Sequence, residues 1–334
     1  MTERAERTIA GSGALASLPA WARTLRAHGT LIALVLLLLF NIAVTPNFLH
    51  LQTLYVNLTQ VSTIAIVAIG MTLVIATGGI DLSVGAMMAL SGALAPLIFT
   101  SAFGQANPEI GLTLAVVLPI MAAAAGGVFN GALVSYLHIQ PIIATLILFI
   151  TGRGIAQVLT NGNLQTFSNP DFSFLGTGRV LGLPVQALIA IGLGLAAAWL
   201  VSRTVYGRYL LAVGGNERAA KLSGVPVKAV KIATYTLCAA LAGVAGLIVS
   251  AINSASDANQ TGQLMELDAI AAAVVGGAAL SGGRAPVLGA ILGAAIIQLV
   301  RYTLLANGVP DAVALIVKAG IIVGAVYLQQ GRKE

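Results

Sequence analysis

Long apolar stretches alternate with short polar segments along most of the chain. A helix needs about 20 predominantly apolar residues to cross the hydrocarbon core of a bilayer. Glycines and prolines interrupt the apolar runs, and the spans that begin near Asp81 and Leu267 are the least distinct. We therefore predict an all-α polytopic membrane protein with about ten (eight to ten) transmembrane helices. The expected spans are 29–46, 53–78, 82–103, 111–137, 140–160, 184–202, 232–252, 267–281, 286–305 and 311–328.

Composition indicates the same class of protein. The 334 residues are 58% hydrophobic and 8% charged, whereas soluble proteins carry about 25% charged residues. The net charge of +6 does not indicate nucleic-acid binding, because the basic residues lie between apolar spans. Cys238 is the only cysteine and lies in an apolar run, which excludes an intrachain disulfide and a multi-cysteine metal site. We expect Cys238 to pack in the interior.

The basic residues also predict the orientation. With both termini in the cytoplasm, thirteen of the 17 lysines and arginines fall on the inner side, as the positive-inside rule requires. The predicted organisation is a cytoplasmic segment 1–28, a single membrane domain 29–328 and a cytoplasmic tail 329–334. Two connecting segments are long, an outer one at residues 161–184 and an inner one at 203–231.

Motifs for catalysis are missing from the sequence. There is no G-x-x-x-x-G-K-[ST] phosphate loop and no H-E-x-x-H. The three histidines are far apart, and no serine has a recognisable His and acid pair. We therefore expect no ATPase site of its own, no catalytic residue, no metal and no cofactor.

One carboxylate stands directly behind two glycines inside an apolar region. Gly78 and Gly79 can end a helix with a left-handed residue, and Asp81 can then cap the next helix. Carboxylates within a membrane also indicate function by default, so Asp81 is a candidate for contact with a solute. The two roles are compatible. Gly276 and Gly277 align with Gly78 and Gly79 and predict a second helix break.

Further polar residues lie in or at the ends of the predicted spans. They are candidates to line a weakly polar channel together with Asp81, although each could instead hydrogen-bond neighbouring helices. These residues are Asn57, Gln60, Asn130 and Asn253.

The inner segment contains a short predicted helix with marked ends. Asn216 suits the N-cap, Glu217 the first turn, Lys221 the last turn and Gly224 the C-terminal stop. A helix of about eight residues is not stable alone in water. It either docks against a partner or lies as a connector on the membrane surface.

Three motifs, in order, resemble the permease subunits of sugar-type ABC importers, the ribose, xylose and galactose group. They are GMTLVIATGGIDLSVGA at Gly70–Ala86, NERAAKLSGV at Asn216–Val225 and ELDAIAAAVVGGAALSGGR at Glu266–Arg284. The resemblance covers about residues 57–318. Two further stretches are most similar to galactofuranose-transporting members: IQPIIATLILFITGRGIAQVLTNG (Ile139–Gly162) and FSNPDFSFLGTG (Phe167–Gly178).

The resemblance implies a type II ABC importer permease fold and a set of partners. Two permease subunits, identical or related, would form the pore, and a periplasmic sugar-binding protein would deliver a monosaccharide. A cytoplasmic ABC ATPase would receive the short helix, so that the coupling segment comprises Asn216, Glu217, Ala219, Ala220 and Gly224. Outer acids such as Asp171 and Asp257 would be candidate contacts for the binding protein.

The main alternative is a secondary sugar transporter coupled to protons or sodium. Proton coupling needs a titratable relay inside the bundle, for which Asp81 and Lys318 are the strong candidates, and neither has an evident partner in the sequence. A third alternative, an intramembrane enzyme or scaffold, lacks a recognisable catalytic constellation. We expect an inner-membrane transport subunit that moves a monosaccharide by alternating access.

Overall fold

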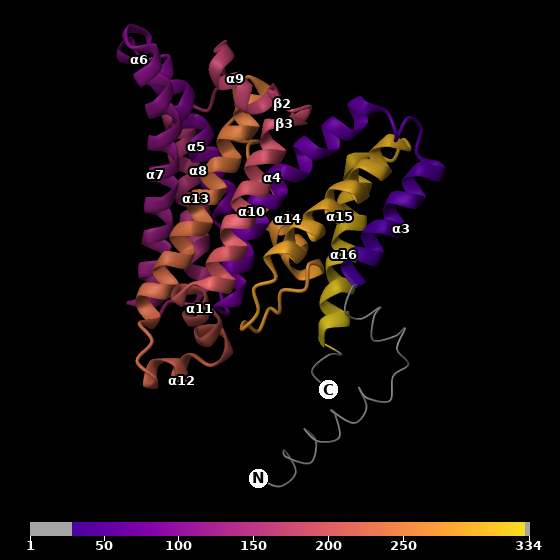
Figure 1. The fold of residues 1–334 in the computed structure, drawn as a ribbon. Coiled ribbons are helices and arrows are strands. Elements are labelled where there is room, and N and C mark those ends of the chain that lie inside the picture. The colour runs from indigo at the N-terminus through magenta and orange to yellow at the C-terminus, as the bar shows by residue number, and fades with distance from the viewer. Residues whose placement is uncertain (1–28, 331–334) are drawn as a thin grey trace.

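The computed structural model describes residues 29–330, which fold into a bundle of helices with two very short sheets (Figure 1). The predicted segment 1–28 and residues 331–334 of the predicted tail lie outside the described residues. The helices are α3 (Gly29–Val44), α4 (Leu51–Ala76), α5 (Val84–Phe99), α6 (Ala102–Ala106), α7 (Pro108–Ser135), α8 (Pro141–Leu159), α9 (Pro170–Thr177), α10 (Val185–Arg203), α11 (Val205–Gly215), α12 (Glu217–Leu222), α13 (Val227–Asn253), α14 (Met265–Val275), α15 (Val287–Ala306) and α16 (Asp311–Gln330). The strands are β1 (Gln165–Thr166), β2 (Arg179–Val180), β3 (Leu183–Pro184) and β4 (Ala255–Ser256).

The described helices confirm a helical membrane protein. Six of them, α4, α7, α8, α10, α13 and α15, are long and apolar enough to cross a bilayer, and α3 and α5 are shorter apolar helices. The expected span at 82–103 is interrupted, since α5 ends at Phe99 and α6 follows. The expected span at 267–281 is the eleven-residue helix α14. The count of ten spans stays a prediction.

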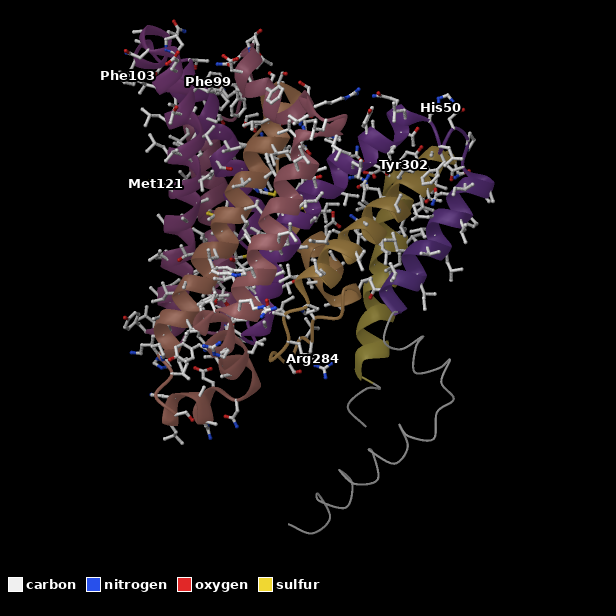
Figure 2. The ribbon with its side chains drawn as sticks, viewed as in Figure 1. His50, Phe99, Phe103, Met121, Arg284 and Tyr302 are labelled. Atoms are coloured by element: carbon white, nitrogen blue, oxygen red, sulfur yellow. The ribbon has the colours of Figure 1, made fainter. Side chains whose placement is uncertain are left out.

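Connecting elements gather at the two ends of the bundle. At one end lie α6, α9 and the β2–β3 hairpin, and at the other lie α11 and α12 (Figure 1); we call these the α9 end and the α12 end. The labelled Arg284, in the loop between α14 and α15, is at the α12 end, whereas His50 and Tyr302 are at the opposite end (Figure 2).

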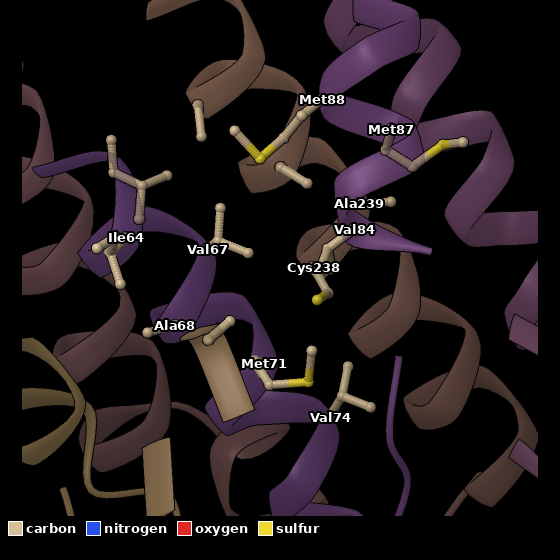
Figure 3. Packing of buried hydrophobic residues seen from close by; sticks show 14 of the residues in the cluster. Ile64, Val67, Ala68, Met71, Val74, Val84, Met87, Met88, Cys238 and Ala239 are labelled. Carbon is tan, nitrogen blue, oxygen red and sulfur yellow. The ribbon is translucent and has the colours of Figure 1, made fainter. Parts of the chain in front are cut away.

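The core is built around α4 and α5. Every residue of α4 from Ser62 to Ala76 is buried, as expected for a helix that is apolar on all sides and enclosed by others. Met71 from α4 lies near Val84 from α5 and Cys238 from α13 (Figure 3). Cys238 is fully buried and unbridged, as expected.

Small residues allow the helices to approach closely in this core. A side chain at Gly127 of α7 would overlap the carbonyl of Tyr235 in α13, and one at Gly131 would lie 2.6 Å from the Cα of Ile232. Gly127 and Gly131, four residues apart, therefore let α7 pack closely against the backbone of α13. A side chain at Gly320 or Gly324 of α16 would instead meet no atom within 4 Å among the described residues.

Candidate functional site

The short helix α12 is closed at both ends by its own sequence. The Asn216 side chain accepts a hydrogen bond from the Ala219 N–H at 3.0 Å, as an N-cap. At the other end Gly224 has a left-handed backbone with φ +81°. Its N–H donates to the Lys221 carbonyl at 3.1 Å and the Val225 N–H donates to the Ala220 carbonyl at 3.0 Å, which is a Schellman closure. The ends of α12 agree with the sequence prediction.

Two contacts fix α12 to the rest of the protein. Lys231 in the first turns of α13 forms an ion pair with Glu217 at 2.7 Å. Ala220 is 5% exposed and packs in a cluster with Leu73 and Ala76 of α4 and Leu210 of α11. Ala220 therefore holds α12 against the membrane domain and does not lie on its free surface.

The free surface of α12 includes a residue that the sequence analysis missed. Leu222 is 90% exposed, and Ala219 is exposed as well. A leucine exposed on a helix that is capped at both ends is a candidate anchor for a partner protein. Leu222 is the last residue of α12, next to Lys221, and no pattern in the sequence indicates its exposure.

Beside α12 lies an open pocket of about 560 Å³. It is formed where the turn between α7 and α8 faces the segment from α12 to the start of α13. Three lysines and one glutamate give the pocket a positive character. Its polar lining residues include Tyr136, Gln140, Glu217, Lys221, Lys228 and Lys231.

The first helix break lies at the C-terminus of α4. Gly78 has φ +79°, its N–H donates to the Ile75 carbonyl at 2.8 Å, and the Gly79 N–H donates to the Val74 carbonyl at 3.2 Å. Gly79 is needed for a different reason, because a side chain there would overlap the Tyr235 hydroxyl. The break therefore uses one glycine for its backbone conformation and the other for close contact.

Asp81 stabilises the turn after this break. Its Oδ1 accepts the Ser83 N–H at 2.9 Å and the Ser83 hydroxyl at 2.6 Å. The expected N-cap position is corrected, because α5 begins at Val84 and its N-cap is Ser83. Asp81 bonds the residue before the helix, in an Asx turn.

A buried polar cluster surrounds Asp81. Asn130 of α7 donates to the Ser83 hydroxyl at 2.9 Å and to Asp81 Oδ1 at 3.5 Å. All three side chains are 0% exposed, and among the described residues no cation forms an ion pair with Asp81. The nearby Tyr235 hydroxyl and Asn130 Oδ1 are buried without a hydrogen-bond partner in this part of the chain. In this conformation the cluster is closed to solutes.

The remaining candidates for the solute path lie elsewhere. Asn57 is buried on α4 and donates to the Thr53 carbonyl at 3.0 Å. Gln60 accepts a hydrogen bond from Gln298 of α15, and Asn253 is exposed at the C-terminus of α13. The structure therefore brings Asp81 and Asn130 together and leaves the other three apart from them.

The second helix break has the same parts in the opposite order. Gly277 supplies the left-handed residue, with φ +98° and its N–H bonded to the Val274 carbonyl at 2.9 Å. Gly276 provides the close contact, since a side chain there would overlap the carbonyl of Gly289 in α15. The predicted alignment of Gly78 with Gly276 thus pairs residues with different roles. By role, Gly78 corresponds to Gly277, and the two breaks are offset by one residue.

Two charged contacts were not found from the sequence. Lys318 of α16 forms an ion pair with Asp268 of α14 at 2.5 Å, and both are about one-tenth exposed. Lys318, expected to lack a partner, therefore has one. Arg153 of α8 donates to the carbonyls of Ala258, Asn259 and Thr261 at 2.8, 3.0 and 3.1 Å. The partners are more than 40 residues apart in the chain, so no local pattern indicates either contact.

Comparison with known proteins identifies the class of protein that these features define. A family model described as branched-chain amino acid transport system / permease component matches residues 54–326. The galactofuranose transporter permease protein YtfT of Escherichia coli (strain K12) is 41% identical over 311 residues, covering 90% of this chain and 89% of the relative. The ribose import permease protein RbsC of the same strain is 40% identical over 310 residues, covering 91% and 94%.

A third relative extends the group to another sugar. The L-arabinose ABC transporter permease protein AraH of Azospirillum brasilense is 32% identical over 304 residues, covering 90% of this chain and 87% of the relative. No solved structure matches the chain. The protein is a multi-pass permease of the bacterial inner membrane. It belongs to the family of sugar ABC importer permeases, as its motifs predicted, and the secondary-carrier alternative is not favoured.

Proposed function

We propose that this chain moves a monosaccharide into the cytoplasm by alternating access, driven by a separate ATPase subunit. The similarity to galactofuranose and ribose permeases over about nine-tenths of the chain supports a galactofuranose-, galactose- or ribose-like substrate. The working topology has ten membrane segments and a type II importer arrangement, with α12 and both termini in the cytoplasm. A second permease, identical or related, would complete the pore.

The observation that carries this proposal is the geometry of α12. A helix of six residues is capped at both ends, is anchored by an ion pair and by buried Ala220, and exposes Leu222 away from the bundle. Such a helix presents a defined shape to a partner at little entropic cost. We place the ATPase on this surface, in contact with Ala219 and Leu222. Asn216, Glu217 and Gly224 would stabilise the helix that the ATPase binds. The basic pocket beside α12 would receive acidic groups of the same partner.

The α9 end suits the binding protein that delivers the sugar. Two outer segments are joined there, because β1 pairs with β4 and Arg153 bonds the loop that follows β4. Rings of Phe99, Phe167 and Phe172 pack with centroids 5.0 to 5.5 Å apart beneath them. These contacts hold the segments at the α9 end together, and we call this end the platform. Asp171 and Asp257 are candidate contacts for the binding protein there.

The test is to identify what co-purifies with the tagged chain from its native host in mild detergent. Three proteins are compared: the original chain, the variant Ala219→Trp with Leu222→Arg, and the control Leu181→Arg. Leu181 is 96% exposed at the opposite end of the molecule, so the control places the same charge on an equally exposed leucine.

We expect an ABC ATPase with the original chain and with the control, and its loss from the α12 variant. If no ATPase accompanies the original chain, the proposal fails. Sugar uptake that stops when the proton gradient collapses, but survives ATP depletion, would point to a secondary carrier.

A further inference from the structure

Three segments from distant parts of the chain meet backbone to backbone at the α12 end. They are the end of α4 (76–79), Gly214 near the end of α11 and the loop after α14 (282–283). The Gly283 N–H donates to the Ala76 carbonyl at 2.9 Å. A Cβ atom at Gly214 would overlap the same carbonyl and lie 2.6 Å from Gly283 N. One at Gly282 would lie 2.7 Å from the Gly214 carbonyl. We call this contact the glycine junction.

The glycine junction is directly connected to α12. Gly214 lies two residues before Asn216, the N-cap of α12, at the end of α11. Ala220 of α12 and Leu210 of α11 pack in one buried cluster with Leu73 and Ala76 of α4. Close-packed interiors transmit displacements because neighbouring groups have no free volume to absorb them.

The glycine junction is also directly connected to both helix breaks. Ala76 is the last residue of α4, and Gly78 provides the left-handed turn that leads to the buried cluster around Asp81. Gly283 lies in the loop that follows Gly277 and enters α15. The glycine junction therefore contains a residue two positions before the N-cap of α12 and residues of both loops that interrupt the membrane helices.

We propose that Gly214 is a positioning residue for transport, whose backbone contact passes movement of α12 to the two helix breaks. The proposal rests on the assignment of α12 as the ATPase-docking helix. Gly214 acts through its lack of a side chain. Any larger residue would separate α11 from Ala76 and Gly283. The ATPase then still binds α12, but its cycle no longer moves the breaks.

The chain provides a matched control next to Gly214. Gly215 is the following residue of α11, and a side chain there would meet no atom within 4 Å. Gly214→Ala and Gly215→Ala therefore make the same chemical change at adjacent helical positions, and only the first disturbs the junction. Each variant is reconstituted in vesicles with the co-purified ATPase and sugar-binding protein, and ATPase binding, ATP hydrolysis and sugar uptake are measured.

We expect Gly214→Ala to bind the ATPase as the original chain does, while uptake per ATP hydrolysed falls about tenfold. Gly215→Ala should stay within about twofold of the original. Equal transport by the two variants would overturn the proposal. Failure of the original chain to bind an ATPase would instead overturn the proposed function, so the two failures are distinguishable.

A second measurement leaves Gly214 unchanged, in case Gly214→Ala does not fold. A fluorophore is attached to Arg284→Cys in a Cys238→Ala background, next to the junction on an exposed side chain. We expect its emission to change when the bound ATPase receives a non-hydrolysable ATP analogue. An unchanged emission with the ATPase demonstrably bound would show that movement of α12 does not reach the loop, and the proposal would be wrong.

Discussion

Single residues place carboxyl groups in the interior of this protein in two different ways. Asp81 is completely enclosed, and its Oδ1 accepts hydrogen bonds from the Ser83 N–H and hydroxyl, which offset part of the loss of water. Asp268 instead has a cationic partner, Lys318, on a neighbouring helix. The first arrangement stabilises a local turn, whereas the second joins α14 to α16.

The pair of Lys318 and Asp268 gives a prediction for stability. Lys318→Met leaves a buried carboxylate without its partner, which costs about 3–5 kcal/mol. Replacing both residues, with Lys318→Met and Asp268→Leu, should restore most of the stability, because a well-packed apolar pair is often as stable as a buried ion pair. Thermal unfolding of the purified original, single and double variants in one detergent measures this. A double variant as unstable as Lys318→Met alone would contradict the prediction.

At the scale of elements, α12 owes its shape to its caps. Asn216→Ala removes the acceptor for the Ala219 N–H and should destabilise the helix by about 1 kcal/mol. We expect about fivefold weaker binding of the ATPase to this variant, measured by titration of labelled ATPase against purified permease. Asn216→Asp keeps an acceptor oxygen at the same position, now on a carboxylate, and should bind within about twofold of the original. Equal binding by all three proteins would show that the cap does not order the docking surface.

Elements whose ends depend on local chemistry could be predicted from the sequence. The ends of α12 follow from Asn216 and Gly224, which act within four residues of themselves. The start of α5 could not be predicted in the same way, because Asp81 bonds Ser83 in a turn before the helix begins. The one-residue offset between the helix breaks arises from contacts with Tyr235 and Gly289. Those contacts are set by the packing of other helices.

At the scale of the whole molecule, hydropathy and charge predicted a polytopic helical bundle, and three motifs predicted its family. They could not show which segments meet. The Asp81–Asn130 cluster and the glycine junction each join parts of the chain that are far apart in the sequence. At the α9 end, Arg153 likewise donates to carbonyls of a loop more than 100 residues away in the sequence.

Arg153 fixes a loop of the platform at the α9 end. Its guanidinium donates to three carbonyls of the loop 258–261, and such charge-assisted bonds are each worth about 1.5–3 kcal/mol. Arg153→Met should release the loop and weaken docking of the sugar-loaded binding protein about tenfold or more. Arg179→Met is the control, because Arg179 is exposed at the same end and stacks on Tyr55 with its guanidinium 3.9 Å from the ring centroid.

Binding of the sugar-loaded binding protein is measured on surface-immobilised permease. ATPase binding at α12 serves as an internal reference. We expect Arg153→Met to lose the binding protein and keep the ATPase, because the two surfaces are at opposite ends of the bundle. If Arg153→Met and Arg179→Met weakened docking equally, general loss of positive charge would explain the effect. If Arg153→Met also released the ATPase, we would conclude that the contacts of Arg153 stabilise the whole bundle and not only the platform.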